Sequence, residues 1–366
     1  MDVIAVDPQR DRRWETFLGT RPEALVYQHP AWLRVLERTY GYEPVALAAE
    51  RESGELGGVL PLVRKRGLLT GRQLSSLPHT PIAGPLAADS GTAAALVRAA
   101  VRIAGAAPGT RLQLKTTIGD LEALGEELTG VIWADAHILE LPEEEGEVRF
   151  GNSRNHSRIK WAVTKAKRAG VQVRRAGSLE DLRAWYRLYV RSLRPHLLPP
   201  HPYRFFQTAW EELRPRGLMR LLLAEQSSGR REPPRLLAGA LLLTFGTTVF
   251  YAFSGLLREA GSLRPNDLLQ WQAIHDARDE GFRRYDLGGG LQSDAGLTAF
   301  KKKWGGHEEP RYRYYHPPEH ERRGPLSRPE LYREGEGRLG RLGKQTWRRL
   351  PDTARIALGQ GFYRYL

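Results

Sequence analysis

The chain has 366 residues, of which 41% are hydrophobic and 27% charged, a composition that is typical of globular domains and excludes wholesale disorder. It contains no cysteine, which excludes disulfides, thiolate nucleophiles and zinc–sulfur centres. The 56 lysines and arginines exceed the 42 acids and give a formal charge of +14, which favours a polyanionic partner such as RNA, anionic lipid or a pyrophosphate-linked carrier. An arginine-rich composition without functional meaning would give the same charge.

No apolar run is long enough to cross a membrane, so we expect no transmembrane helix. The first residues, MDVIAVDPQRDRRWE, carry early acids and no apolar stretch, so we expect no secretory signal. We therefore expect a cytoplasmic protein, with peripheral contact with the inner membrane face as the alternative.

The first part of the chain, residues 1–150, is predicted to form one mixed α/β unit. Its apolar spacing predicts, in chain order, a helix at Pro30–Tyr40, a hairpin of strands Val45–Ala49 and Gly57–Val63, a helix at Thr92–Gly105 and a strand at Arg111–Thr116. Segment Ser75–Ala88 is apolar but broken by prolines and glycines, which is typical of a segment that lines a site.

A second unit is predicted to start after the acidic turn Glu143–Glu147, with a basic helix at Ser153–Ala169. The elements that follow are a strand at Val171–Arg174, helices at Leu179–Ser192 and Pro202–Leu213, a strand at Leu218–Glu225, a hairpin of Leu236–Thr244 and Thr247–Ser254, a helix at Pro265–Glu280 and a strand at Tyr285–Leu287. Both halves run helix, apolar strands, helix and closing strand, which indicates a structural duplication.

The tail that begins at Pro317 is basic. Within Arg338–Leu366, apolar and aromatic residues alternate with arginines and lysines. Such a segment can lie in the interface of an anionic bilayer or pack its apolar residues on the first unit. Both interpretations remain open from the sequence.

Three stretches in this order resemble the Fem family of non-ribosomal peptidyltransferases and its acetyltransferase-like (GNAT) relatives in envelope biosynthesis. The stretches are residues 27–32 (YQHPAW), the basic helix with Asn155, Lys160, Lys165, Lys167 and Gly170, and a closing run of PNDLL (265–269), YDLGG (285–289) and FKKKWG (300–305). The resemblance covers about residues 27–306. It implies mixed α/β sheets in tandem acetyltransferase-like domains, at 1–150 and 151–316, with the acceptor site in the second and the tail 317–366 packed back on the first.

The resemblance also implies a reaction. Members of the family take an amino acid from aminoacyl-tRNA and attach it to an amine on a peptidoglycan or other cell-envelope precursor, so the expected partners are tRNA and a precursor with phosphate groups. No tightly bound cofactor is expected, and the scattered histidines predict no metal site. One alternative is an acyl-CoA-dependent N-acyltransferase in cell-surface polysaccharide synthesis, and another is a non-catalytic scaffold that binds RNA or membrane.

The CoA alternative lacks its usual sequence signal. Acetyltransferases that hold CoA carry an Arg/Gln-x-x-Gly-x-Gly/Ala turn that opens a helix, and this spacing is missing at Ala83–Ser90 and at Gly261–Asn266.

Candidate site residues cluster near the closing run. The resemblance assigns precursor phosphates to Lys301, and the adjacent Lys302 offers a second point charge beside glycines that permit close backbone approach. Tyr251 matches a cleft tyrosine of the family, and Asn266 begins a helix whose free N–H groups favour an anion. A solvated basic face, strand packing and helix capping are the corresponding structural interpretations.

Further substrate contacts are expected from four residues, namely Trp32, Arg34, Arg194 and Tyr203. The family's proposed base is the aspartate of Gly-Pro-x-x-Asp, and here the carboxylate comes one position later, at Asp89. Asp89 is therefore the candidate catalytic residue, and a substrate-assisted route without a dedicated base is the alternative.

Overall fold

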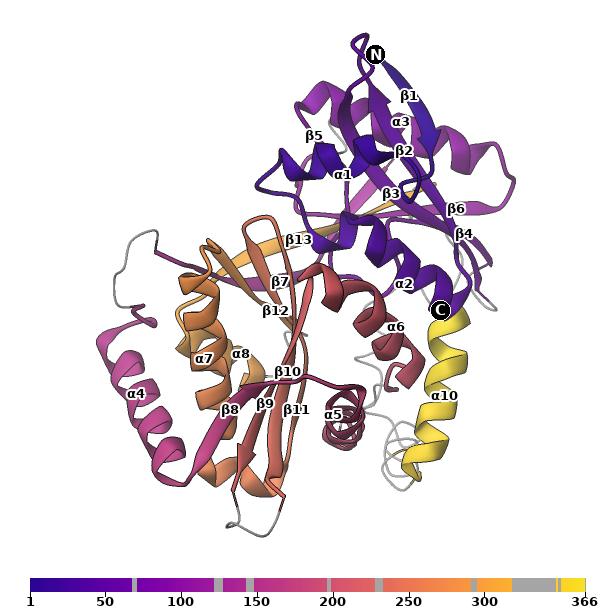
Figure 1. Cartoon of the computed structure of the whole chain (residues 1–366). Coiled ribbons are helices and arrows are strands. Elements are labelled where there is room, and N and C mark those ends of the chain that lie inside the picture. Colours follow the sequence, from indigo (N-terminus) through magenta and orange to yellow (C-terminus); the bar gives the residue numbers. More distant parts are fainter. Residues whose placement is uncertain are drawn as a thin grey trace. The chain divides into compact units, whose positions relative to one another are not determined.

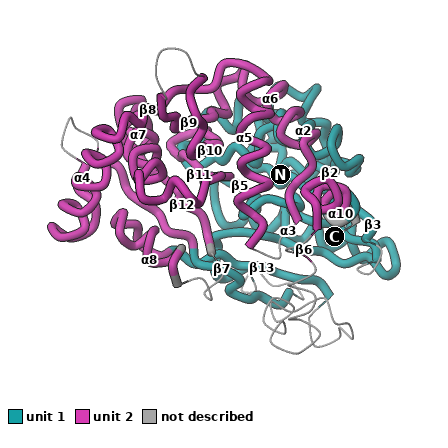
Figure 2. The backbone as a smooth tube through the Cα atoms, turned by 90° about the horizontal axis from the view of Figure 1, so that it is seen from below, with its two compact units in different colours: residues 1–135, 309–344, 360–366 teal, residues 136–308, 345–359 magenta. Residues whose placement is uncertain are grey.

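The structure is a computed structural model that describes residues 1–365, apart from 68–70, 122–127, 143–147, 196–198, 228–232, 291–294, 318–346 and 348–349. The chain divides into two compact units, which Figure 2 colours separately. Unit 1 contains the described residues within 1–135, 309–344 and 360–366, and unit 2 those within 136–308 and 345–359. The predicted turn Glu143–Glu147 lies outside the described residues.

Unit 1 is a mixed sheet with helices packed against it (Figure 1). Its elements are β1 (Asp2–Val6), α1 (Arg12–Gly19), α2 (Pro30–Tyr40), β2 (Glu43–Glu50), β3 (Leu56–Gly67), β4 (Gly71–Ser75), β5 (Leu86–Ala87), α3 (Ser90–Gly105), β6 (Thr110–Thr116) and most of β13 (His307–His316). The strand order is β1-β2-β3-β4-β6-β13, with β5 added to β3. The pair of β4 and β6 is parallel, and α3 packs on β2, β3 and β6.

The apolar segment after β4 is packed inside unit 1. The Ser76 hydroxyl accepts a hydrogen bond from the Lys115 amide on β6, and the Ala83 amide donates to the Lys115 carbonyl. The buried Lys115 ammonium donates to the carbonyls of Leu77 and Thr80, at 2.8 and 3.2 Å. Burial lowers the pKa of Lys115 well below its usual range. The segment therefore completes the interior of unit 1 beside the parallel strand pair.

Unit 2 is a mixed sheet region with helices on both faces (Figure 1). Its elements are the end of β7 (Thr129–Glu140), α4 (Ser153–Arg168), β8 (Val171–Arg175), α5 (Leu179–Ser192), α6 (Tyr203–Leu213), β9 (Met219–Gln226), β10 (Arg235–Phe245), β11 (Thr248–Leu256), α7 (Pro265–Asp279), β12 (Arg284–Gly290) and α8 (Ala295–Lys303). The order β7-β12-β11-β10-β9-β8 makes β11 and β12 neighbouring interior strands. Helices α5 and α6 pack on one face, and α7, with α4 against it, packs on the other.

The last described element is α10 (Asp352–Tyr365), whose first part belongs to unit 2 and whose last turn belongs to unit 1. In unit 2, Asp352 accepts a hydrogen bond from Arg194 at 3.3 Å, and the buried Arg355 guanidinium lies against Asp352. In unit 1, the Tyr363 carbonyl accepts a hydrogen bond from the Tyr42 hydroxyl at 2.6 Å. Helix α10 therefore packs against other parts of the protein, whereas residues 338–346 of the tail lie outside the residues that the structure describes. Among the described residues, no helix combines the length and apolarity needed to cross a membrane.

Candidate functional site

Two neighbouring interior strands of unit 2, β11 and β12, separate partway along their length. β11 pairs in parallel with β12 only over Thr248–Phe250 against Arg284–Asp286, although both strands continue beyond this point. On its other side, β11 is distorted by a bulge at Ala252, because Leu241 faces Phe253 whereas Leu242 faces Tyr251. Backbone groups of β11 beyond Phe250 are thus released from pairing with β12, and they must find other hydrogen-bond partners. We call this place the β11/β12 opening.

The glycine-rich end of β12 shapes one side of the opening. Gly288 has φ of +80°, a conformation that other residues adopt at a cost, and its amide donates to the Asp286 carboxylate at 2.7 Å. The Lys301 ammonium, on α8, donates to the carbonyls of Gly288 and Gly289 at 2.8 and 2.9 Å. Lys301 is only 4% exposed. The Lys301 ammonium therefore holds the glycine turn at the end of β12 through these two hydrogen bonds.

Several buried polar atoms near the opening have no hydrogen-bond partner among the described residues. They are the hydroxyls of Tyr251 and Tyr285, both amide atoms of Gln270 and the Asn266 side-chain oxygen. Burial raises the pKa of Tyr251 to about 12 although Ser254 lowers it slightly, and burial, with a smaller contribution from Tyr251, raises the pKa of Tyr285 well above its usual value although Gln270 lowers it. Both tyrosines are thus neutral near pH 7. An unpartnered buried polar group is costly in a core, so each such group calls for an explanation, and contact with a bound molecule is one.

The start of α7 completes the site. Arg264 precedes the helix in the left-handed conformation, and Pro265 occupies its first turn. The Asp267 carboxylate, 7% exposed, forms an ion pair with Lys303 of α8, and the Lys303 ammonium also lies 5.0 Å from the Phe300 ring centroid. A carboxylate already occupies the positive end of the helix, which makes this helix start less favourable for a second anion.

Two of the predicted site residues, Tyr251 and Lys301, lie close to Gly288 at the β11/β12 opening. Asn266 lies in the first turn of α7, next to Asp267, which pairs with Lys303 of α8. Lys302 points outward, with its side chain 57% exposed, and pairs with Glu308 at 3.1 Å. The predicted contact Arg194 follows α5 and Tyr203 begins α6, and these two helices pack on the other face of the sheet from α7. Arg194 binds Asp352, and the Tyr203 ring packs on Tyr186 with ring centroids 5.2 Å apart.

The predicted site residues of unit 1, namely Trp32, Arg34 and Asp89, have surroundings that indicate a structural role. Trp32 is 1% exposed in the core, with its ring 5.1 Å from Tyr27, and Arg34 is half-buried on the same helix. Asp89 is the N-cap of α3: its carboxylate accepts hydrogen bonds from the Thr92 amide at 2.8 Å and the Thr92 hydroxyl at 2.9 Å. The hydrogen bond from the Thr92 amide is the main cause that lowers the pKa of Asp89.

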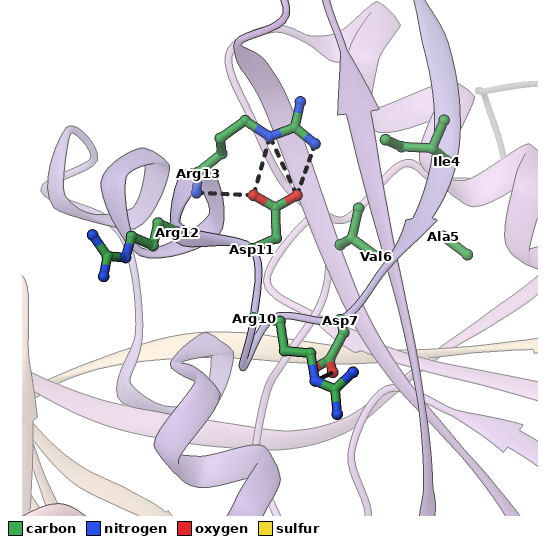
Figure 3. Close-up of a pocket in the computed structure, with 8 residues that line it drawn as sticks. All are labelled: Ile4, Ala5, Val6, Asp7, Arg10, Asp11, Arg12 and Arg13. Carbon is green, nitrogen blue, oxygen red and sulfur yellow. Dashed lines mark hydrogen bonds and ion pairs between the residues drawn. The ribbon is translucent and has the colours of Figure 1, made fainter.

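A shallow hollow at the N-terminus of unit 1 is lined by Ile4–Asp7 and Arg10–Arg13 (Figure 3). Its central carboxylate, Asp11, caps α1 and pairs with Arg13 at 2.7 Å. Because the Asp11 carboxylate is already paired with Arg13, the hollow does not bring together side chains that would act on a substrate. The β11/β12 opening therefore remains the candidate site.

Sequence reasoning did not find Gln270, Tyr285 or Lys303 as site residues. Tyr285 lies in the YDLGG motif, but its pattern is that of any buried strand residue. Gln270 is a polar residue within a predicted helix, and nothing in the local spacing shows that its side chain is fully buried. Lys303 could have been found from Asp267, because the two charges belong to the two motifs that meet here.

Comparisons with known proteins agree with this architecture. Residues 153–302 match the family model described as acetyltransferase (GNAT) domain, and the chain is a tandem GNAT-fold protein. It is similar to the crystal structure of FemX, with TM-score 0.67 and 18% identity over 86% of this chain and 97% of that one. The predicted fold class and the resemblance to the Fem family are thus confirmed.

Two other solved structures share the fold. The C-terminal domain of a putative lysylphosphatidylglycerol synthetase from Agrobacterium fabrum matches with TM-score 0.55 and 14% identity, over 83% of this chain and 90% of that one. A tandem GNAT protein from the clavulanic acid biosynthesis pathway matches with TM-score 0.51 and 11% identity, over 86% and 97%. No curated protein matches the chain.

Proposed function

We propose that this chain is an aminoacyltransferase of the Fem type, which transfers an amino acid from aminoacyl-tRNA to an amine on a peptidoglycan or other cell-envelope precursor. The observation that carries the proposal is the β11/β12 opening, where released backbone groups and unpartnered buried side chains gather beside Tyr251. The similarity to FemX supports the same class of reaction. The reaction then takes place in the cytoplasm, where charged tRNA is available.

The chemistry required is aminolysis of an ester. The acceptor amine attacks the ester carbonyl, the carbon–oxygen bond to the terminal ribose breaks, and the leaving ribose oxygen takes a proton while the amine loses one. The Tyr251 hydroxyl remains protonated near pH 7, since burial raises its pKa to about 12, and it has no partner in the described protein. We assign to it the hydrogen bond to the developing oxyanion or leaving oxygen.

The carboxylates near the opening are engaged by the protein, because Asp286 accepts a hydrogen bond from the Gly288 amide and Asp267 forms an ion pair with Lys303. Asp89 belongs to unit 1, and its carboxylate oxygens are engaged by Thr92 in capping α3. A carboxylate with a lowered pKa is also a weaker base. We therefore favour the substrate-assisted route, in which positioning of the two substrates supplies most of the acceleration.

The acceptor's phosphates require accessible cations. The resemblance assigns a phosphate contact to Lys301, but two hydrogens of its ammonium are donated to the carbonyls of Gly288 and Gly289. Lys302 is more accessible, because its side chain is 57% exposed and pairs with the half-exposed Glu308. We therefore assign the first phosphate contact to Lys302 and turn positioning to Lys301.

A second candidate function is N-acylation from acyl-CoA, which the match to the acetyltransferase family model favours. The start of α7 argues against it, because Asp267 places a carboxylate where a pyrophosphate would bind. The binding scaffold without catalysis is the third possibility.

The test is incubation of the purified full chain with charged tRNA or acetyl-CoA, each with a panel of cell-envelope precursors, followed by mass spectrometry. We expect a mass increase of one amino acid residue on a precursor, and only with charged tRNA. An acetyl increase would establish the CoA reaction instead. No product with either donor would reject both transferase assignments.

A further inference from the structure

Helix α4 exposes a continuous basic face. Its buried side is formed by Ile159, Ala162, Val163 and Ala166. The exposed side carries a row at successive spacings of four and three residues, which places its members on one face of the helix: Arg154, Arg158, Trp161, Lys165 and Arg168. The helix contains no acidic residue. We call this row the α4 stripe.

Among the described residues, no acidic side chain neutralises the arginines of the stripe. On the adjacent strand β8, Arg174 pairs with Asp181 and Glu225, and Arg175 pairs with Glu280. By contrast, Arg154, Arg158 and Arg168 have no acidic partner among the residues that the structure describes. Unpaired cations at regular spacing are complementary to a repeating polyanion.

Trp161 lies in the middle of the stripe and is 56% exposed. The Lys165 ammonium lies 5.3 Å from its ring centroid, and the Arg264 guanidinium lies 5.7 Å from it. An aromatic ring between cations is suited to stacking on an unpaired base while the cations meet phosphates. An interfacial membrane helix would need several apolar residues on this face, and Trp161 is the only large one that α4 exposes.

The stripe leads to the β11/β12 opening within the same unit. Arg264, which reaches over Trp161, is the residue that directly precedes α7, and Asn266 follows two positions later. Helix α4 also packs along α7 (Figure 1). A strand bound on the stripe can therefore deliver its end to the opening.

We propose that the α4 stripe binds RNA, with its cations on the phosphodiester backbone and Trp161 stacked on an unpaired base. That the RNA carries the donated amino acid rests on the proposed function, but the binding itself does not.

The test uses fluorescence anisotropy with a labelled synthetic RNA hairpin that has a short unpaired 3′ end and carries no amino acid. Arg154→Gln with Arg158→Gln should weaken binding and lower the salt dependence, because each lost phosphate contact reduces the slope of log K against log salt by about 0.7–0.9. Trp161→Ala should weaken binding by about 5- to 150-fold. The matched control is Arg10→Gln with Arg12→Gln, which removes two exposed arginines from unit 1 and should leave binding nearly unchanged.

Equal affinity of the stripe variants, the control and the unchanged chain would overturn this inference. The inference would also be overturned if the chain pelleted with phosphatidylglycerol vesicles, Trp161→Ala abolished this pelleting, and the same substitution left RNA affinity unchanged. That result would identify a membrane-binding face. The proposed function fails by a different result, the absence of transfer from charged tRNA, and that result does not affect a binding constant measured with uncharged RNA.

Discussion

The hydroxyls of Tyr251 and Tyr186 are both buried in unit 2, but they differ in their partners. The Tyr186 hydroxyl donates to the His201 carbonyl at 3.0 Å, whereas the Tyr251 hydroxyl has no partner among the described residues. A buried hydroxyl that forms no hydrogen bond does not stabilise the fold. The presence of the Tyr251 hydroxyl at the β11/β12 opening is therefore better explained by a contact with the substrate.

Tyr251→Phe should reduce the rate of transfer by about 10²-fold or more without lowering the melting temperature, since it removes a proton donor but no internal hydrogen bond. The control is Tyr186→Phe, which removes an internal hydrogen bond and should lower stability by about 1 kcal/mol while transfer is retained. Transfer assays and thermal melts of both variants distinguish the roles. Equal activity of Tyr251→Phe and the unchanged chain would contradict the assignment.

Lys301→Met should destabilise the chain by about 2–4 kcal/mol, because it removes two charge-assisted hydrogen bonds from a buried ammonium and leaves two carbonyls without a donor. Lys302→Met is the neighbouring control, and it should melt like the unchanged chain because its ion pair is exposed. Chemical denaturation measures both. If Lys301→Met is as stable as the control, the ammonium does not hold the glycine turn.

Asp89 provides a contrast between capping and catalysis. Asp89→Asn keeps a side-chain oxygen for the Thr92 amide, so melting and transfer should both change little, whereas Asp89→Ala should lower the melting temperature. Because the folded pKa of Asp89 is lowered, its ionised form contributes stability above the unfolded pKa, and this contribution is lost as the pH falls through the folded value. A 10²-fold or larger loss of turnover in well-folded Asp89→Asn would show that it is the base after all.

At the scale of elements, the geometry of the opening depends on one backbone conformation at the end of β12. Gly288 has φ of +80°, and an added Cβ would lie 3.8 Å from the Lys301 ammonium and 3.9 Å from the Tyr251 carbonyl. Space is therefore sufficient, and the cost of a side chain comes from the left-handed backbone. Gly41, which ends α2 in unit 1, has φ of +71° and also has free space around a Cβ.

Gly288→Ala and Gly41→Ala should each cost about 1–2 kcal/mol of stability for the same reason. Only Gly288→Ala should also reduce transfer, because relief of the strain would turn the carbonyls that Lys301 holds. Matched melts and transfer assays separate the two effects. Transfer that is reduced equally by both substitutions would show that stability alone determines it.

Most elements could be predicted because their periodicity is local. The helix Pro30–Tyr40 was predicted at the bounds observed, and it has a proline at its start and a left-handed glycine after its end. The hairpin of β10 and β11 follows from two apolar runs around Phe245-Gly246. In the site, the glycine turn and the lysine run were visible as motifs.

The rest of the site depends on contacts between distant residues. Lys301 was expected to face phosphate, but its burial against Gly288 arises from the approach of α8 to β12, which no local pattern encodes. The separation of β11 from β12 and the bulge at Ala252 are properties of strand pairing rather than of either strand's composition. For the same reason, the buried amide of Gln270 could not be distinguished from an exposed one.

At the scale of the whole molecule, α10 matters because its residues belong to both compact units. Its glycines offer a test of how it is held. In unit 2, a Cβ on Gly359 would lie 2.1 Å from the Pro200 carbonyl oxygen, so only glycine fits there. A Cβ on Gly361, two residues later, would meet nothing within 4 Å.

Both substitutions with alanine should favour the helix intrinsically by about 0.5–1 kcal/mol, because glycine loses more freedom when a helix forms. Gly361→Ala should therefore melt at the same or a higher temperature, whereas Gly359→Ala should melt lower because the helix cannot approach Pro200.

A chain that ends at Leu350 should lose at least as much stability as Gly359→Ala. It should also pellet with anionic vesicles to the same extent as the full chain, because the contacts of α10 with Tyr42 and Arg194 are contacts with protein. Loss of vesicle binding on truncation, with unchanged melting of Gly359→Ala, would instead favour a tail that binds the membrane.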